Sequence, residues 1–186
     1  MINTESSSIT RELMRDIQEK LLLDKHSIHG PDHWSRVRKN GLLLCPHTGA
    51  DTIVVELFAV IHDSQRWNDG RDLEHGPRAA AYARRVYKEL FDCTVRQLEL
   101  LVQACMGHTT GLHSPDSTVQ TCWDADRLDI GRCGFDVDPR FLGTQAARSG
   151  HMITYAMSAS RGKPDRTLHQ IKRDLAEDVA LTKRRA

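Results

Sequence analysis

The feature that most constrains this chain is a nearly unbroken apolar run that ends in an adjacent histidine and aspartate. The run covers residues 54–61, and His62 and Asp63 follow it directly. A run of this kind has to be buried, and burying an ionised carboxylate without partners is costly. We therefore expect a metal ion or a hydrogen-bonded network at the point where the run stops.

The composition is that of one globular domain. The chain has 186 residues, which is enough to form a hydrophobic core that needs no disulfides or structural metal for stability. Its formal net charge is +1, so no bulk field attracts nucleic acid or an anionic membrane. No apolar stretch approaches the roughly 20 residues that span a bilayer, and residues 1–8 lack the pattern of a signal peptide. We expect a cytoplasmic protein with no membrane association and no clear nucleic-acid binding; the oligomeric state is left open.

The numbers of cysteines and histidines indicate different roles for the two residue types. The five cysteines are an odd number without a CxxC pair, and most fall in apolar helical patterns, which favours free buried thiols. The ten histidines are more than a chain of this size usually carries. This excess is a first indication of metal chemistry.

Apolar residues recur at three- and four-residue spacing along most of the chain, which is typical of amphipathic helices. Residues 53–61 are rich in β-branched side chains, but an isolated strand would find no sheet here, so we predict a buried helix. We expect loops at 45–50 and 64–75. Helices are predicted at 9–23, 31–44, 53–61, 76–90, 94–106, 114–131, shortly after 139, at 151–159 and from 163 onward.

The predicted fold is therefore an all-α, single-domain bundle of about six to eight helices. One domain accounts for residues 1–186. Its core covers about 29–131, and the helices of 139–186 pack on it.

The predicted helix after Ser114-Pro115 directs a carboxylate at the core. Its apolar stripe includes Val119, Cys122 and Trp123, and Asp126 falls on that stripe. Asp129 lies near the same face, whereas Asp124 points roughly 160° away from Asp126. Asp126 is thus a candidate metal ligand, with an arginine partner as the alternative, and Asp124 is expected behind the ligands or at the surface.

His33 also faces inward, because Val37 and Leu44 follow it at helical spacing. Alone it could be an ordinary core histidine. Together His33, His62, Asp63 and Asp126 make a set of two imidazoles and two carboxylates. Such a set suits one divalent ion among Mn, Fe, Co, Ni, Zn and Mg, with water completing the coordination sphere.

These residues carry a resemblance to a known family. The order of His33 within His33-Trp34-Ser35-Arg36-Val37, then His62-Asp63, then Asp126 within Ala125-Asp126-Arg127-Leu128 resembles the HD-domain superfamily of metal-dependent phosphohydrolases. The resemblance covers about 29–131. It implies a compact HD-type helical bundle that hydrolyses phosphomonoesters, phosphoanhydrides or phosphodiesters, in a small phosphorylated metabolite or a nucleotide.

The resemblance also implies roles for individual side chains. A bound cation polarises a phosphoryl oxygen and lowers the pKa of water, and Asp126 is expected to orient that water while serving as a ligand. Phosphoryl transfer otherwise needs positioning and positive charge. Arg66 and Arg127 are the expected cationic substrate contacts. Arg36 is a third, or else it pairs with a carboxylate inside the bundle.

The sequence departs from its relatives at Arg66, where several nucleotidases of the superfamily have an acidic residue or histidine as catalytic acid. An arginine cannot shuttle a proton near neutral pH. His75 and His108 are the candidate replacements, because both continue apolar stripes towards a shared centre. They are interpreted as acid and base, as ligands of a second metal, or as structural histidines. The short segment between Asp63 and His75 favours a single metal.

Two other functions stay open. Some HD-type proteins use two irons and oxygen, and His75 with His108 could complete such a site. A non-catalytic sensor or interaction module is the other, but it would have no reason to keep the complete ligand set.

Overall fold

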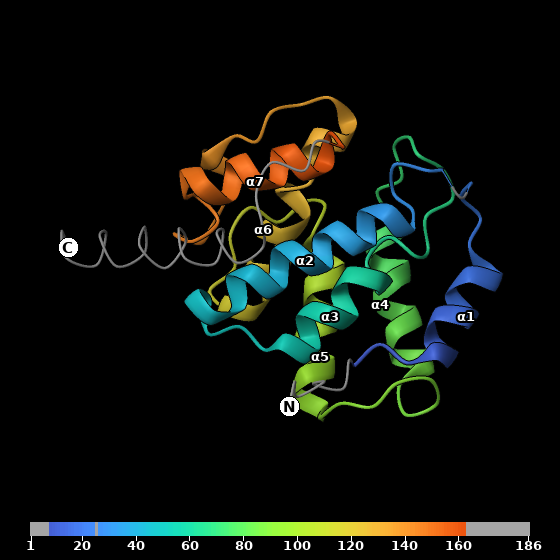
Figure 1. The fold of residues 1–186 in the computed structure, drawn as a ribbon. Helices are drawn as coiled ribbons and strands as arrows, with labels where there is room; N and C mark the ends of the chain where they lie inside the picture. The colour runs from blue at the N-terminus through green and yellow to red at the C-terminus, as the bar shows by residue number, and fades with distance from the viewer. Residues whose placement is uncertain (1–7, 25, 163–186) are drawn as a thin grey trace, which may run out of the picture.

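The computed structural model describes residues 8–24 and 26–162, and in this part the all-α prediction is confirmed. These residues form seven α-helices, two short 3-10 helices and no strand (Figure 1). The helices are α1 (Arg11–Lys20), α2 (Pro31–Thr48), α3 (Thr52–Ile61), α4 (His75–Val86), α5 (Val95–Gly107), α6 (Ser117–Arg127), η1 (Ile130–Cys133), η2 (Pro139–Phe141) and α7 (Gly150–Ser160).

The apolar run forms α3, which lies at the centre of the bundle between α2 and α5 (Figure 1). Asp51 caps its first turn by accepting hydrogen bonds from the backbone N–H groups of Ile53 and Val54. Residues 54–61 are all buried, including Glu56, whose carboxylate pairs with the Arg38 guanidinium. Burial on several sides explains why this helix shows no polar face.

Helix α2 packs against α3, α6 and α7, so it joins the two ends of the domain. Gly41 permits the close approach to α3, because a Cβ atom there would overlap the Val55 side chain. A second apolar cluster forms where α7 lies along α2 and η1, and it includes Leu44, Leu128 and Met152.

Several predicted boundaries are wrong. The helices predicted at 9–23 and 76–90 end earlier, at Lys20 and Val86. Residues 45–50 were expected as a loop, but α2 continues through Pro46 to Thr48 and ends at Gly49, whose φ of 70° is the left-handed conformation. Burial of Leu43, Leu44 and Cys45 outweighs the cost of about 3 kcal/mol for an internal proline. Helix α6 begins at Ser117 with Asp116 as its cap, and it ends at Arg127 instead of near Gly131.

The helix predicted from residue 163 lies outside the described residues. None of the helices within 8–24 and 26–162 is both long and apolar enough to cross a bilayer.

Candidate metal centre

Five helices deliver six side chains to one buried site. We call this set the His/Asp cluster; it consists of His33 in α2, His62 and Asp63 at the end of α3, His75 at the start of α4, His108 at the end of α5 and Asp126 in the last turn of α6. The Asp126 side chain is the most accessible member, with 16% of its surface exposed. The other five are almost fully buried, so the site opens towards solvent at Asp126.

The first group within the cluster contains the four ligands expected from the sequence. His33 Nε2 and His62 Nε2 are 3.1 Å apart. Asp126 Oδ1 lies 3.3 Å from the His33 nitrogen and 3.8 Å from the His62 nitrogen. Asp63 Oδ2 lies 3.6 Å from both. His33, His62 and Asp63 form a group that could hold a metal ion, and Asp126 lies beside its two histidine nitrogens.

The second group shares Asp63 with the first. Asp63 Oδ1 lies 3.1 Å from His75 Nε2 and 3.7 Å from His108 Nε2, and the two nitrogens are 2.7 Å apart. One carboxylate therefore offers an oxygen to each of two groups that could each hold a metal ion.

In each of the four histidine rings Nδ1 lies next to an acceptor oxygen, and this contact fixes the orientation of the ring. We therefore assign the proton of each neutral ring to Nδ1, which leaves a lone pair on every Nε2. The acceptors are Asp129 Oδ2 for His33 (2.7 Å), the Phe58 carbonyl for His62 (3.0 Å), the Cys105 carbonyl for His108 (2.8 Å) and the Asp72 carbonyl for His75.

Lone pairs that face one another need positive charge between them. The Thr109 hydroxyl lies 3.2 Å from His75 Nε2 and 3.3 Å from His108 Nε2, and its single hydrogen satisfies one of them; Arg66 Nη1 also lies 3.3 Å from His75 Nε2. Asp63 Oδ1 is buried and has no hydrogen-bond donor among residues 8–24 and 26–162, which is costly for a carboxylate. A divalent cation between these atoms would satisfy all of them, so the donor set fits a metal.

The electrostatics of the cluster agree with this fit. Burial lowers the pKa of His62 to about 3, so the ring is neutral at physiological pH, as a metal ligand has to be. Burial opposes ionisation of Asp63 and Asp126, but the neighbouring histidines outweigh it and hold both pKa values below their usual range. The pKa of His108 is raised, because Asp63 and Asp126 outweigh its burial. The site thus favours two carboxylates and an added positive charge.

The short segment between Asp63 and His75 does not prevent His75 and His108 from lying close to Asp63. Gly76 makes the contact possible, because a Cβ atom there would lie 2.5 Å from the Cys105 carbonyl oxygen and 3.4 Å from the His108 ring. The first residue of α4 can therefore lie against the last turn of α5. Loop length, which favoured a single metal in the sequence, does not separate one metal from two.

The three arginines predicted to contact substrate lie in different surroundings. Arg66 is buried, with Nη1 3.6 Å from Asp63 Oδ1 and its other nitrogens donating to the carbonyls of Asn68 and Gly70. Arg36 donates through Nε and Nη2 to both oxygens of Asp129, the carboxylate pairing considered for it above. Asp129 thereby orients His33 and holds Arg36 at once.

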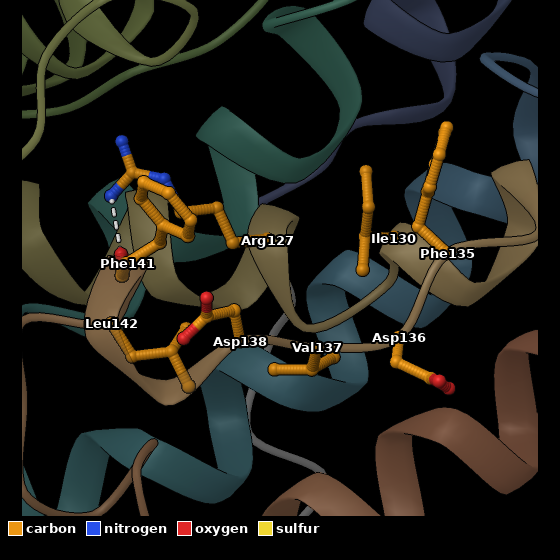
Figure 2. A pocket seen from close by; sticks show the side chains of 8 residues that line it. All are labelled: Arg127, Ile130, Phe135, Asp136, Val137, Asp138, Phe141 and Leu142. Atoms are coloured by element: carbon orange, nitrogen blue, oxygen red, sulfur yellow. Dashed lines mark hydrogen bonds between the residues drawn. The ribbon is translucent and has the colours of Figure 1, made fainter.

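The Arg127 side chain binds backbone carbonyls and lines a pocket. Its guanidinium donates to the backbone carbonyls of Gly111, Leu112 and Phe141, and it lines a separate pocket of about 330 Å³. Figure 2 shows the bond to Phe141 at one end of this pocket, with Ile130 and Phe135 at the other. None of the residues that line the pocket belongs to the His/Asp cluster, and the substrate contact of Arg127 stays a prediction.

The structure also shows the surroundings of three further residues near the site. His29, in the segment before α2, is buried with Nδ1 2.9 Å from Asp69 Oδ1. Asp124 is fully buried and accepts hydrogen bonds from Gln120 and from Gly143 and Thr144 of the C-terminal loop. Arg132, which no pattern singled out, lies 3.7 Å from Asp126 Oδ1.

No protein-family model matches the chain, and no curated protein or solved structure matches it either. Membership of the HD-domain superfamily therefore stays a prediction. The structure itself supplies a buried histidine and aspartate cluster that could bind a metal ion.

Proposed function

We propose that the protein is a metal-dependent phosphohydrolase whose His/Asp cluster would hold divalent cations, with His33, His62 and Asp63 as one possible ligand group and Asp63, His75 and His108 as another. The observation that carries the proposal is the buried Asp63 carboxylate, with one oxygen towards each pair of facing Nε2 atoms. Cations bound there would supply Lewis acidity towards a phosphoryl oxygen and acidify water. The resemblance to HD-domain phosphohydrolases, carried by the same residues, supports this chemistry.

The charge balance supports an anionic substrate. Three carboxylates at the cluster are matched by three guanidinium groups: Asp63 lies near Arg66, Asp126 near Arg132, and Asp129 near Arg36 and Arg132. The cluster is thus close to neutral while its histidines are neutral. Divalent cations then leave an excess of positive charge, which a phosphate ester offsets at the accessible Asp126 side.

Proton transfer follows from the same arrangement. The Asp126 carboxylate, at the exposed edge, accepts a hydrogen bond from the attacking water and orients it. Arg66 stays protonated, so it contributes charge next to Asp63 and no proton. When His75 and His108 act as ligands they cannot donate a proton, and the leaving group draws its proton from solvent on the Asp126 side.

The second group also favours one alternative, a di-iron enzyme that uses oxygen. Metal analysis combined with oxygen-electrode measurements separates the two functions. Oxygen consumption by the iron-loaded protein, without phosphate release from any phosphorylated compound, would replace the hydrolase proposal by this one.

A phosphate-release screen tests the proposed function. The panel contains nucleotides, cyclic dinucleotides and sugar phosphates, each with Mn, Co, Ni or Mg; the cyclic dinucleotides are read by product separation. We expect turnover of at least one class, and we expect Asp63→Asn to abolish it. The proposal fails if the wild-type protein binds metal and turns over nothing in the panel, or if folded Asp63→Asn retains wild-type turnover.

A further inference from the structure

Arg132, in η1, is held rigidly at the edge of the His/Asp cluster. Its side chain is only 9% exposed. Nε donates to the Ile28 carbonyl at 2.9 Å, and Nη1 donates to the Asp129 carbonyl at 3.0 Å. These two backbone contacts fix the plane of the guanidinium before any ligand arrives.

The remaining nitrogen of Arg132 faces the accessible part of the site. Nη2 lies 3.7 Å from Asp126 Oδ1, too far for a hydrogen bond. Within residues 8–24 and 26–162 this nitrogen donates to no acceptor. A buried cationic donor is therefore left over at the edge where the cluster opens to solvent.

The other arginines near the cluster are committed to other partners. Arg36 is bound to the Asp129 carboxylate through Nε and Nη2. Arg66 has all three nitrogens in contact, Nε and Nη2 with loop carbonyls and Nη1 with His75. Arg132 alone combines a fixed plane, a free nitrogen and proximity to Asp126 among these three. Its guanidinium is also the kind of donor that suits phosphate oxygens.

We infer that Arg132 is a substrate-binding residue, and that its Nη2 donates to a non-bridging oxygen of the phosphoryl group bound beside Asp126. This inference rests on the proposed function, which it makes more specific by placing the phosphoryl group at the Asp126 end of the cluster. The competing role for Arg132 is structural, as a counter-charge that holds Asp126 and Asp129 in place.

Binding of inorganic phosphate to the Mn-loaded protein, measured by calorimetry, distinguishes the two roles. The variants are Arg132→Gln and Arg132→Lys. The matched control is Arg140→Gln, which removes an exposed arginine that pairs with Asp138. Manganese content and thermal unfolding are measured for every variant. Arg132→Lys keeps the positive charge near the carboxylates, so it is informative even where Arg132→Gln does not fold.

We expect Arg132→Gln to weaken phosphate binding by about tenfold or more, with manganese content unchanged and Arg132→Lys in between. Arg140→Gln should match the wild type. The inference is overturned if the wild-type protein binds no phosphate at millimolar concentration. It is also overturned if the folded Arg132 variants bind phosphate normally, or lose phosphate only in proportion to lost manganese.

The same experiment separates this inference from the proposed function. Arg132-dependent phosphate binding without hydrolysis in the screen would remove the hydrolase activity and keep the anion site. Hydrolysis that persists with unchanged KM in the Arg132 variants would keep the function and remove the role of Arg132.

Discussion

Each histidine of the His/Asp cluster has one ring nitrogen fixed by the fold and the other directed at a neighbour. The acceptors of the Nδ1 atoms are three backbone carbonyls and the Asp129 carboxylate. Contacts of this kind set the tautomer and orientation of metal-binding imidazoles. The site is therefore shaped by ordinary packing of helix ends, before a cation binds.

Asp124 and Asp126 lie on the same helix but have separable roles. Asp126→Asn removes a ligand oxygen, and we expect metal affinity to fall by at least about tenfold with little loss of stability. Asp124→Asn weakens the bonds to Gly143 and Thr144, and we expect it to cost about 2 kcal/mol or more. Metal titration and urea unfolding of both variants check this. Equal loss of metal affinity in the two variants would contradict the assignment.

The buried state of His62 predicts a pH-dependent stability of the metal-free protein. Its pKa is lowered by burial from 6.5 to about 3, so between these pH values the unfolded chain binds a proton that the folded chain excludes. His62 therefore lowers stability as pH falls below about 6.5, by up to about 1.4 kcal/mol per pH unit. The raised pKa of His108 acts in the opposite direction.

Comparison with a His62→Gln variant isolates this effect, because the contribution of His108 is present in both proteins. Urea unfolding of chelator-treated samples between about pH 7 and pH 4.5 should show the wild-type protein losing more stability than the variant. Parallel curves would mean that His62 is not buried in a neutral form.

The sequence supports the prediction of His33, His62, Asp63 and Asp126 as one group, because each lies on or just after an apolar stripe that has to face the core. The structure brings all four together. The place of Arg132 could not be predicted, since it lies within the short 3-10 helix η1, which has no apolar period. The sequence placed Asp129 near the same helix face as Asp126, but it did not predict that Asp129 contacts His33 and Arg36.

At the level of elements, the site is built from helix ends. His62 is the C-terminal cap of α3, His75 begins α4 and His108 caps α5. These ends meet only because the backbones approach closely, and Gly76 is the residue that allows α4 to reach α5. The second group of possible ligands therefore depends on a residue that binds nothing.

Gly76→Ala tests this dependence. The added methyl group would press on the Cys105 carbonyl, so we expect a cost of about 1–3 kcal/mol and a loss of metal at the second group. Gly150→Ala is the matched control, because a Cβ atom there meets nothing within 4 Å. Thermal unfolding and metal content are the measurements. Unchanged values for Gly76→Ala would show that α4 does not need this contact.

Helices with a clear apolar period were predictable, and their ends were less so. Pro46 predicted a loop, but burial of the preceding leucines keeps α2 helical past it. Ser114-Pro115 predicted a helix start, whereas Asp116 makes the cap through two backbone N–H groups. Local signals gave way to tertiary packing in the first case and to a better cap in the second.

For the whole molecule, the cluster acts as the junction of α2, α3, α4, α5 and α6. A ligand that binds the folded state alone stabilises it in proportion to the logarithm of its concentration above Kd. Because the cluster joins five helices, cation binding should raise the stability of the bundle as a unit. This links the proposed chemistry to an observable that needs no substrate.

The most direct measurement is therefore the metal stoichiometry of the protein after equilibrium dialysis against Mn. We predict about two equivalents per chain for the wild type, about one for the His75→Ala/His108→Ala double variant, and far weaker binding for Asp63→Asn. Binding of no manganese by folded wild-type protein, or wild-type binding by folded Asp63→Asn, would contradict the assignment of the His/Asp cluster as a metal centre.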